Sequence, residues 1–221
     1  MMDNLNYSVI MPVKNGVNYL HDALESIYTQ SVRPSEIIVI DDHSTDSTKE
    51  TLRCNYPDVL VIDNTSNGQA AALNLGIRIA KFEVLAFLDH DDLWTNNKQE
   101  IQLDILKQNK DFDAITSGVA NFSQQGDMRN LGPARVFGAS SFRKNVFSRY
   151  GYLEESISHH AIIEWWIRAE SGGMTHSTHP EIGLMRRIHL TNSGTINKSA
   201  SRTELFSILR KQISRVGENE V

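Results

Sequence analysis

The stretch Leu85-Ala86-Phe87-Leu88-Asp89-His90-Asp91-Asp92 is an apolar run of strand length that ends in three acids and one histidine. An apolar run without polar alternation is typical of a strand that is buried on both faces, as in a parallel sheet. Asp89 and Asp91 lie two residues apart, so in an extended chain their side chains project to one side. Paired carboxylates of this kind suit Mg²⁺ or Mn²⁺, which often take phosphate oxygens as further ligands. An acid-rich turn without a metal is the alternative interpretation, and spacing alone does not decide between the two.

The composition of the whole chain is that of an ordinary folded protein. Its 221 residues, 40% of them hydrophobic, are enough for one substantial core. The formal net charge of −5 argues against nucleic acid as the main partner, because nucleic-acid binding requires a basic surface. The single cysteine, Cys54, excludes an internal disulfide and fits a reducing compartment. The chain starts without the features of a signal peptide and has no apolar run of roughly 20 residues. We therefore expect a cytoplasmic protein, with peripheral membrane contact left open.

Strands and helices are predicted to alternate through the first half of the chain. Alternation at this pitch indicates a parallel sheet with crossover helices, in which ligands bind beyond the carboxyl ends of the strands where the strand order switches. Asp41 and Asp42, which end the second predicted strand, are therefore expected to share one rim with Asp89 and Asp91. The predicted strands are 7–11, 36–40, 59–62 and 83–88, and the predicted helices are 17–28, one that follows the capping residues 44–48, and 70–80.

The second half of the chain alternates less regularly, and no repeat, low-complexity tract or linker divides it from the first. Trp165 is predicted to be a core residue, and Trp166 the wall of a cleft, on the argument that only one of them faces inward on a helix. We predict one α/β domain with a mostly parallel central sheet flanked by helices. The predicted elements are a helix at 97–108, a strand at 113–122, a hairpin or mobile loop at 123–133, helices at 142–147 and 162–171, a strand at 181–188 and an amphipathic helix at 203–216.

Several segments, in the same order along the chain, resemble family 2 glycosyltransferases of the GT-A fold. The match covers nearly all of residues 7–94 and thins out in the second half. The segment FLDHDDLW, which ends at Trp94, resembles the DXD motif of that family. The other similar segments are SVIMPVKN at 8–15, IVIDDHSTD at 38–46, Asn67-Gly68 with Asn74-Leu75-Gly76 and Ala80, the stretch 138–154, EWWIRA at 164–169 and RRIHLTN at 186–192.

The resemblance implies a metal-dependent hexosyltransferase that moves a sugar from a nucleoside diphosphate sugar, with a UDP-sugar favoured, usually with inversion. The implied acceptor is a glycan, a lipid-linked or a peptide substrate, and the implied setting is bacterial polysaccharide synthesis. A single GT-A domain is implied for residues 1–221, with a donor half at about 1–96, an acceptor half at about 97–200 and a C-terminal helix at about 202–217. That helix is open to a role in membrane-surface contact or homodimer formation.

The resemblance also implies roles for individual residues. A Mn²⁺ or Mg²⁺ ion held by Asp91 would stabilise the charge on the diphosphate leaving group, with Asp89 reaching the metal or the ribose. His189 is a candidate to complete the metal shell. The predicted contacts with the nucleotide sugar are Pro12, Val13, Asn15, Asp41, Asp42, Asn67, Gly68, Asn74, Asp89, His90 and Arg187, with Asp41 or Asp42 accepting a hydrogen bond from the base.

The general base is the point at which the sequence departs from the family. Ala161 and Ile162 stand where the family carries an acid pair, and Glu164 matches only a later acid. Two residues along a helix is about 200° of rotation, so Glu164 does not simply replace an acid at Ile162. Three interpretations stay open: Glu164 is the base after reorientation, His159 or His160 serves instead, or the base is absent. The last would fit a catalytically silent nucleotide-sugar binding module, and a nucleotidyltransferase of related fold is a further alternative.

Overall fold

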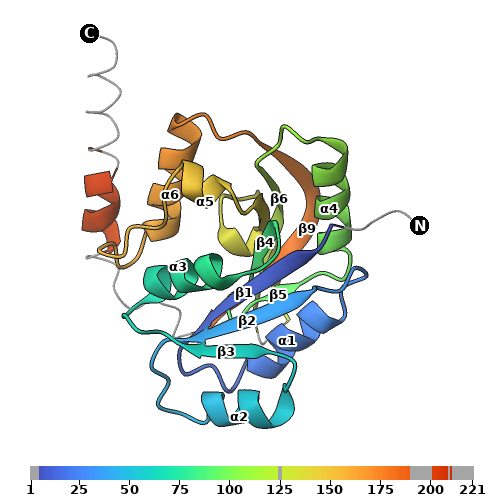
Figure 1. The fold of residues 1–221 in the computed structure, drawn as a ribbon, viewed down its shortest axis with the longest axis vertical. Coiled ribbons are helices and arrows are strands. Elements are labelled where there is room, and N and C mark those ends of the chain that lie inside the picture. Colours follow the sequence, from blue (N-terminus) through green and yellow to red (C-terminus); the bar gives the residue numbers. More distant parts are fainter. Residues whose placement is uncertain (1–4, 124–125, 190–200, 209, 211–221) are drawn as a thin grey trace.

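The structure is a computed structural model that describes residues 5–123, 126–189, 201–208 and 210. Helices cover both faces of one curved sheet in a single α/β domain, as predicted (Figure 1). The sheet order is β3-β2-β1-β4-β8-β6-β9-β5, with β7 paired to β6. The strands are β1 Tyr7–Val13, β2 Glu36–Asp41, β3 Leu60–Asp63, β4 Val84–Phe87, β5 Leu93–Trp94, β6 Ala114–Ser123, β7 Met128–Pro133, β8 Ser140–Arg143 and β9 His176–Ile188. The helices are α1 Leu20–Tyr28, α2 Thr48–Asn55, α3 Gln69–Ile79, α4 Lys98–Gln108, α5 Val146–Arg149 and α6 Ala161–Ser171, with a 3₁₀ turn at Phe137–Ala139.

The first four strands pair in parallel, which confirms the alternation read from the sequence. Strand β1 lies at their centre, where Ile10 is in register with Ile38 of β2 and Phe87 of β4. The chain runs outward from β1 through β2 to β3 and then returns to place β4 on the other side of β1. The strand order therefore switches between β1 and β4, and a crevice is expected beyond the carboxyl ends of these two strands.

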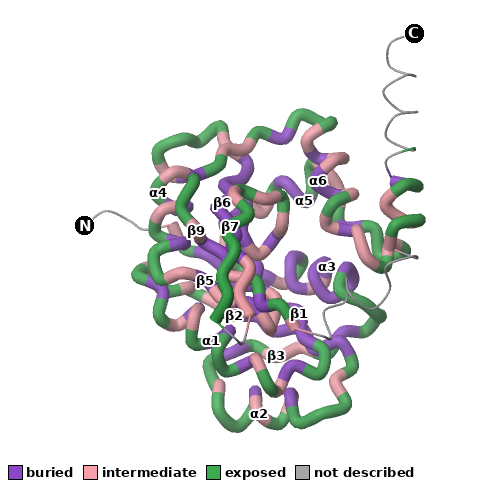
Figure 2. Tube along the Cα trace, turned by 180° about the vertical axis from the view of Figure 1, so that it is seen from behind, coloured by how far each residue is buried: buried purple, intermediate pink, exposed green. Residues whose placement is uncertain are grey.

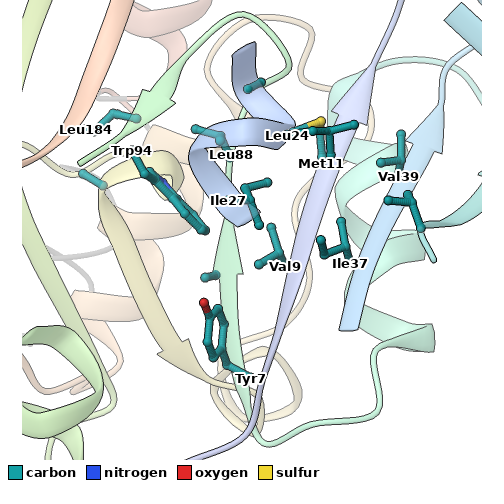
Figure 3. Close-up of a cluster of buried hydrophobic side chains, with 14 of the residues drawn as sticks. Tyr7, Val9, Met11, Leu24, Ile27, Ile37, Val39, Leu88, Trp94 and Leu184 are labelled. Carbon is teal, nitrogen blue, oxygen red and sulfur yellow. The ribbon is translucent and has the colours of Figure 1, made fainter. Parts of the chain in front are cut away.

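Two apolar layers attach helices to opposite faces of the sheet. Val9 and Met11 of β1 point toward Leu24 and Ile27 of α1, in the layer that α4 also joins (Figure 3). Ile10, which alternates with them, belongs to the second layer, shared by α3, α5 and α6. Because side chains of a strand alternate between its faces, the unbroken apolar sequence of β1 supplies both layers at once.

Strand β1 extends two residues beyond its predicted end at Met11. Pro12 lies inside the strand, in register with Ile40 of β2. On the other side, the register of β1 with β4 stops at Ile10, so at Pro12 the strand has only one neighbour. A proline lacks the backbone N–H that a second neighbour would require, and this one-sided position tolerates it.

The helix predicted over 142–147 is wrong in its first half, because Ser140–Arg143 forms strand β8 and only Val146–Arg149 is helical. Phe142 is in register with Leu85 of β4 and Ala114 of β6, so it lies inside the sheet. The prediction for 123–133 is confirmed as a hairpin, whose strand β7 is exposed (Figure 2).

Both tryptophans of α6 are buried, which corrects the prediction that Trp166 lines a cleft. Trp165 stacks on Phe147, with ring centroids 4.9 Å apart, while Trp166 packs against Phe142 and His176. The last strand, β9, supplies His176 because it begins five residues before its predicted start, and it covers a second side of the helix. Helix α6 is therefore enclosed on two sides.

The C-terminal helix predicted at 203–216 is confirmed where the structure describes it. Residues 201–208 and 210 are helical, and the rest of the prediction lies outside the described residues. Within those described parts of the chain, none of the helices is long and apolar enough to cross a membrane.

Gly76 of α3 supplies a test of this packing. A methyl group at this position would lie 2.4 Å from Cγ2 of Ile10, a fully buried side chain of the central strand. Helix propensity favours alanine over glycine by roughly 1 kcal/mol. We nevertheless expect Gly76→Ala to lower the free energy of unfolding by about 1–3 kcal/mol, because overpacking outweighs propensity. Urea denaturation measures the change.

Ile10→Ala provides the matched background for that experiment. It removes the methyl group that the new side chain would meet, so Gly76→Ala should cost clearly less stability in the Ile10→Ala protein. Equal costs in the two backgrounds, or a stabilised Gly76→Ala protein, would contradict the close contact between α3 and β1.

Candidate active site at the carboxyl edge of the parallel strands

The loops after β1 and β2 are joined by side-chain-to-backbone hydrogen bonds. Asn15 adopts a left-handed conformation, with φ of 52°, and its side-chain oxygen accepts a hydrogen bond of 2.7 Å from the backbone N–H of Thr45. Its own backbone N–H donates to Oγ of Ser44 at 2.9 Å, and that of Gly16 donates to Oγ1 of Thr48 at 2.9 Å. Asn15 therefore fixes the shape of the rim through its side chain and backbone together.

The Asp42 carboxylate connects the second loop to the third. It accepts hydrogen bonds from the side chain of Asn64 at 2.8 Å and from the backbone N–H of Gly68 at 3.0 Å. Gly68 has a φ of 93°, a conformation that residues with a side chain rarely adopt. Lys14 lies 3.7 Å from the same carboxylate. The rim thus holds Asp42 in place with neutral donors and one exposed cation.

Asp41 is fully buried at the end of β2 and is incompletely paired. Its Oδ2 atom accepts a hydrogen bond from the backbone N–H of Ser44 at 3.0 Å and lies 3.3 Å from Nζ of Lys49. Its Oδ1 atom has no hydrogen-bond partner among the described residues. A buried acceptor without a donor costs free energy, so Oδ1 marks a position that a donor group of a ligand would relieve.

The loop after β4 carries Asp89, Asp91 and Asp92. It lies against the loop after β1 and against the start of α3, which follows the loop after β3. Oδ1 of Asp89 accepts a hydrogen bond of 2.9 Å from the side chain of Gln69, at the start of α3. A methyl group on Gly16 would lie 2.5 Å from Cδ2 of His90, so the histidine ring is in close contact with the loop after β1. Asp89 and His90 therefore lie at the predicted switch point between β1 and β4.

His189 reaches the same loop from the end of β9. Its Nε2 atom donates a hydrogen bond of 2.9 Å to Oδ2 of Asp91, a residue 98 positions earlier in the chain. The imidazole ring stacks on Tyr19, with centroids 4.9 Å apart, which fixes its plane. The structure thus brings together Asp91 and His189, two of the three residues that the resemblance assigns to the metal; Asp89 is the third.

Arg187 forms hydrogen bonds that join the acidic loop to α1. Its backbone N–H donates to Oδ1 of Asp92 at 2.9 Å, its Nε to the carbonyl of Asp91 at 3.0 Å, and its Nη2 to Asp22 at 2.9 Å. The guanidinium carbon also lies 5.0 Å from the centroid of the Tyr19 ring. From its sequence, Arg187 is predicted to contact the nucleotide sugar. In the structure, its hydrogen bonds hold the turn that contains Asp91 and Asp92.

Crowding of the carboxylates changes their acidity. Burial, and then the charge of Asp91, raises the pKa of Asp89 to about 6. Burial, and then the charges of Asp89 and Asp91, raises the pKa of Asp92 well above its ordinary value. Negative charge is therefore costly at this edge of the sheet, and a cation bound here would reduce that cost.

The donor atoms at the rim fit a divalent cation in part. Within residues 5–123, 126–189, 201–208 and 210, no group of three or more His, Cys, Asp or Glu side chains is arranged to hold a metal ion. Asp91 and His189 already touch, and a carboxylate oxygen with an imidazole nitrogen is an acceptable ligand pair for Mn²⁺. Mg²⁺ and Mn²⁺ sites commonly use one or two protein carboxylates and complete their shell with substrate phosphates.

The candidate bases lie on the first turn of α6 and just before it, and the side chains of two of them, Glu164 and His160, already have a partner. Both oxygens of Glu164 are bound by Arg168, at 3.0 and 3.1 Å. Nε2 of His160 lies 2.8 Å from Oγ of Ser201. The carboxylate of Glu204 accepts hydrogen bonds from the backbone N–H groups of residues 158, 159 and 160, which attaches the C-terminal helix to this turn.

The remaining predicted contacts differ in position. Asn74 is buried, and its amide group is bonded to both backbone groups of Leu153 and to Glu155, so it joins α3 to the loop before α6. Pro12 and Val13 are buried at the end of strand β1, just before the rim. Asn67 is exposed beside Gly68.

Sequence reasoning missed three residues that hold side chains of the site: Asn64 on Asp42, Gln69 on Asp89 and Tyr19 on His189. Asn64 follows the third strand, so the rule that site residues follow parallel strands would have identified it. Gln69 is the first residue of α3, and Tyr19 precedes α1, and neither position carries a sequence signal of contact with Asp89 or His189. These two contacts depend on how the helices are placed on the sheet.

Comparison with known proteins identifies the family. The family described as Glycosyl transferase family 2 matches residues 8–164, more than half of the chain. An uncharacterised glycosyltransferase of Rickettsia typhi is 43% identical over 107 residues, which are 47% of this chain and 33% of that protein. The chain thus spans about a third of the length of this relative. A UDP-Glc:alpha-D-GlcNAc-diphosphoundecaprenol beta-1,3-glucosyltransferase of Escherichia coli is 32% identical over 110 residues, 49% of this chain and 44% of that protein.

A solved structure shares the fold. The crystal structure of residues 1–349 of TarS from S. aureus, in complex with UDP, superimposes with a TM-score of 0.74 at 16% sequence identity. The similarity covers 94% of this chain and 64% of that one. This likeness confirms the predicted fold class.

The raised pKa of Asp89 gives a testable pH dependence. In the folded protein the Asp89 carboxyl keeps its proton up to about pH 6, whereas in the unfolded chain it loses that proton near pH 4. The folded state therefore binds more protons between these values, so the free energy of unfolding falls as the pH rises through about 4 to 6. Above that window the ionised Asp89 is a net cost.

Asp89→Asn should consequently raise the melting temperature of the chelator-treated protein at pH 7 and flatten its decline between pH 4 and 6. The asparagine still accepts the hydrogen bond from Gln69. Asp104→Asn, an exposed acid on α4, is the control and should leave the profile unchanged. Thermal unfolding at several pH values tests this, and an Asp89→Asn protein that is less stable than the parent at pH 7 would refute it.

Proposed function

The chain belongs to glycosyl transferase family 2, and we propose that it transfers a hexosyl residue from a nucleoside diphosphate sugar to an acceptor hydroxyl. The observation that carries this proposal is the meeting of Asp42, Asp89 and Asp91 with the loop of Asn15 at the switch point between β1 and β4. Such a crevice suits a nucleotide, since loops from several strands supply both backbone donors and carboxylates.

The base and ribose of the donor are expected to occupy the part of the rim nearest β2. No described residue donates a hydrogen bond to Oδ1 of Asp41, and Asp42 is held by Gly68, so these acids are the candidates to accept a hydrogen bond from an N–H group of the base. Uracil carries such a group, which supports a UDP-sugar as donor. Pro12, Val13, Asn15 and Asn67 would line the floor and edge of this part.

The diphosphate is expected to lie beside the loop after β4. Asp91 and His189, with Asp89 close by, are the residues that would hold Mn²⁺ or Mg²⁺. When bound, the ion supplies Lewis-acid stabilisation of the negative charge that develops on the leaving diphosphate. His90 packs against Gly16 and so limits the space that is open to the sugar, while Arg187 keeps Asp91 in place.

The acceptor is expected to approach from the second half of the chain, in keeping with a donor half at about 1–96 and an acceptor half at about 97–200. The named E. coli relative supports a lipid-linked glycan as one acceptor class. Transfer with inversion requires a base at the acceptor hydroxyl. Both oxygens of Glu164 are bound to the Arg168 guanidinium, whereas the bonds of His160 to Ser201 use only its Nε2 atom and involve no charged partner. We therefore assign the base to His160 and a positioning role to Glu164.

A catalytically silent module that only binds the nucleotide sugar is the second candidate. The observation in its favour is the occupation of the usual acidic positions by Ala161 and Ile162. Measurement of nucleoside diphosphate release from a bound donor separates the two functions, because a silent module binds the donor and releases no product.

A panel of nucleoside diphosphate sugars with Mn²⁺ tests donor binding. We expect at least one, a UDP-sugar, to bind in a metal-dependent way, and Asp91→Asn to weaken that binding by at least about tenfold through loss of a ligand. Isothermal titration calorimetry measures the affinities, with Asp104→Asn as an exposed control of the same chemistry. Absence of binding by every donor, or equal binding by Asp91→Asn, would refute the donor site.

Two substitutions on α6 test the base. His160→Gln should lower kcat for transfer by about 100-fold or more, with donor affinity retained, because only proton removal is lost. Glu164→Gln should lower thermal stability more than it lowers transfer. Arg168 stays in place in this variant, because it keeps its bonds to the carbonyls of Tyr150 and Tyr152. The reverse outcome, in which Glu164→Gln abolishes transfer and His160→Gln does not, would assign the base to Glu164 instead.

A further inference from the structure

A cavity of about 550 Å³ opens at the amino end of β4, at the opposite edge of the sheet from the acidic rim. Its walls come from the end of α3, the residues before β4, the end of β8 and the start of α5. In the chain, Glu83 at this cavity and Asp89 at the rim are the two ends of one extended segment, which at about 3.3 Å per residue spans roughly 20 Å. The cavity is therefore separate from the donor site.

The charge of the cavity is opposite to that of the whole protein. Four cationic side chains line it, and Glu83 is the single carboxylate among its lining residues, in a chain whose formal net charge is −5. The four cations are Lys81, Lys110, Arg143 and Lys144. Lys81 forms an ion pair with Glu36, at 3.4 Å. For the other three, the described part of the chain supplies no carboxylate within salt-bridge distance.

Two of these cations are fixed in position by the ends of neighbouring helices. Arg143 donates from Nε to the carbonyl of Phe112 at 2.9 Å and from Nη2 to that of Leu106 at 2.7 Å, where α4 ends. Lys144 donates from Nζ to the carbonyl of Ala80, where α3 ends. Within the described residues these bonds do not use the second terminal nitrogen of Arg143, Nη1, and they hold both charges without neutralising them.

Capping of helix C-termini explains part of this arrangement, because cations are favourable near those carbonyls. It explains neither the exposed Lys110 nor the cavity between the four cations. The cavity is also lined by the aromatic and apolar residues Phe82, Tyr152 and Ile77. Fixed cations together with aromatic residues, in a cavity of this size, are typical of a site for a small anionic ligand that also carries a ring or a carbon chain.

We propose that this cavity binds a phosphate-bearing ligand at a second site, remote from the donor rim. Guanidinium and ammonium groups together match the oxygens of a phosphodiester or a diphosphate. The ligand is either a free diphosphate or a phosphate within a glycan chain, and the two share the chemistry that the cations recognise. The proposal does not depend on the proposed transferase activity.

Binding to the chelator-treated full chain tests the proposal, since removal of divalent cations disables the donor rim. Inorganic pyrophosphate and a phosphodiester-linked polyol oligomer are titrated separately by calorimetry. We expect Lys110→Glu to weaken binding by at least about tenfold, because one attractive charge becomes repulsive. Lys110 is exposed, so Lys110→Glu should leave folding unaffected. Lys81→Gln is a second variant, which removes one lining cation without placing a carboxylate beside Glu36, the partner of Lys81.

Arg129→Glu makes the same charge change on the exposed strand β7 and should bind as the parent does. Asp91→Asn should also leave this binding unchanged, which separates the cavity from the donor rim. Tighter binding of the oligomer would identify chain phosphates as the ligand, and tighter binding of pyrophosphate a free diphosphate. Absence of binding by both probes, or unchanged binding by Lys110→Glu and Lys81→Gln, would overturn the proposal.

Discussion

Strand β1 is hydrogen-bonded to β2 on one side and to β4 on the other, and this pairing determines where each loop of the site begins. The return of the chain across β1 brings His90, on the loop after β4, against Gly16, on the loop after β1. Asn15 and Asp42 then connect these loops to those after β2 and β3. The rim is thus a consequence of strand order, with polar side chains that hold it in one shape.

The same edge of the sheet concentrates negative charge, which opposes folding and favours a cation. Asp89 and Asp92 both have raised pKa values, while Arg187 and His189 supply the nearest donors from the last strand. We therefore expect the acidic rim to be less stable than a neutral one would be, as is typical of sites that bind charged ligands. The second half of the chain thus supports the acidic loop of the first half, through the bonds of Arg187 and His189 to Asp91.

The sequence predicts the parallel half of the fold well, because strand length, apolar pattern and the placement of acids agree over residues 7–94. It predicts the second half less well for physical reasons. Phe142 lies in a strand because β4 and β6 flank it, a non-local contact that no local pattern reveals. Arg187 has the charge expected of a phosphate ligand, and only the placement of β9 shows that it holds the acidic turn. Asn74 likewise belongs to the family pattern, yet its side chain faces Leu153.

A crystal structure with Mn²⁺ and UDP, collected at a wavelength that gives manganese an anomalous signal, would locate the ion and the nucleotide. We expect an anomalous peak bound by the Asp91 carboxylate and the diphosphate, with the uracil ring against Asp41 or Asp42. Nucleotide density away from the carboxyl edge of β1 and β4, or a manganese peak that Asp91 does not touch, would contradict this expectation.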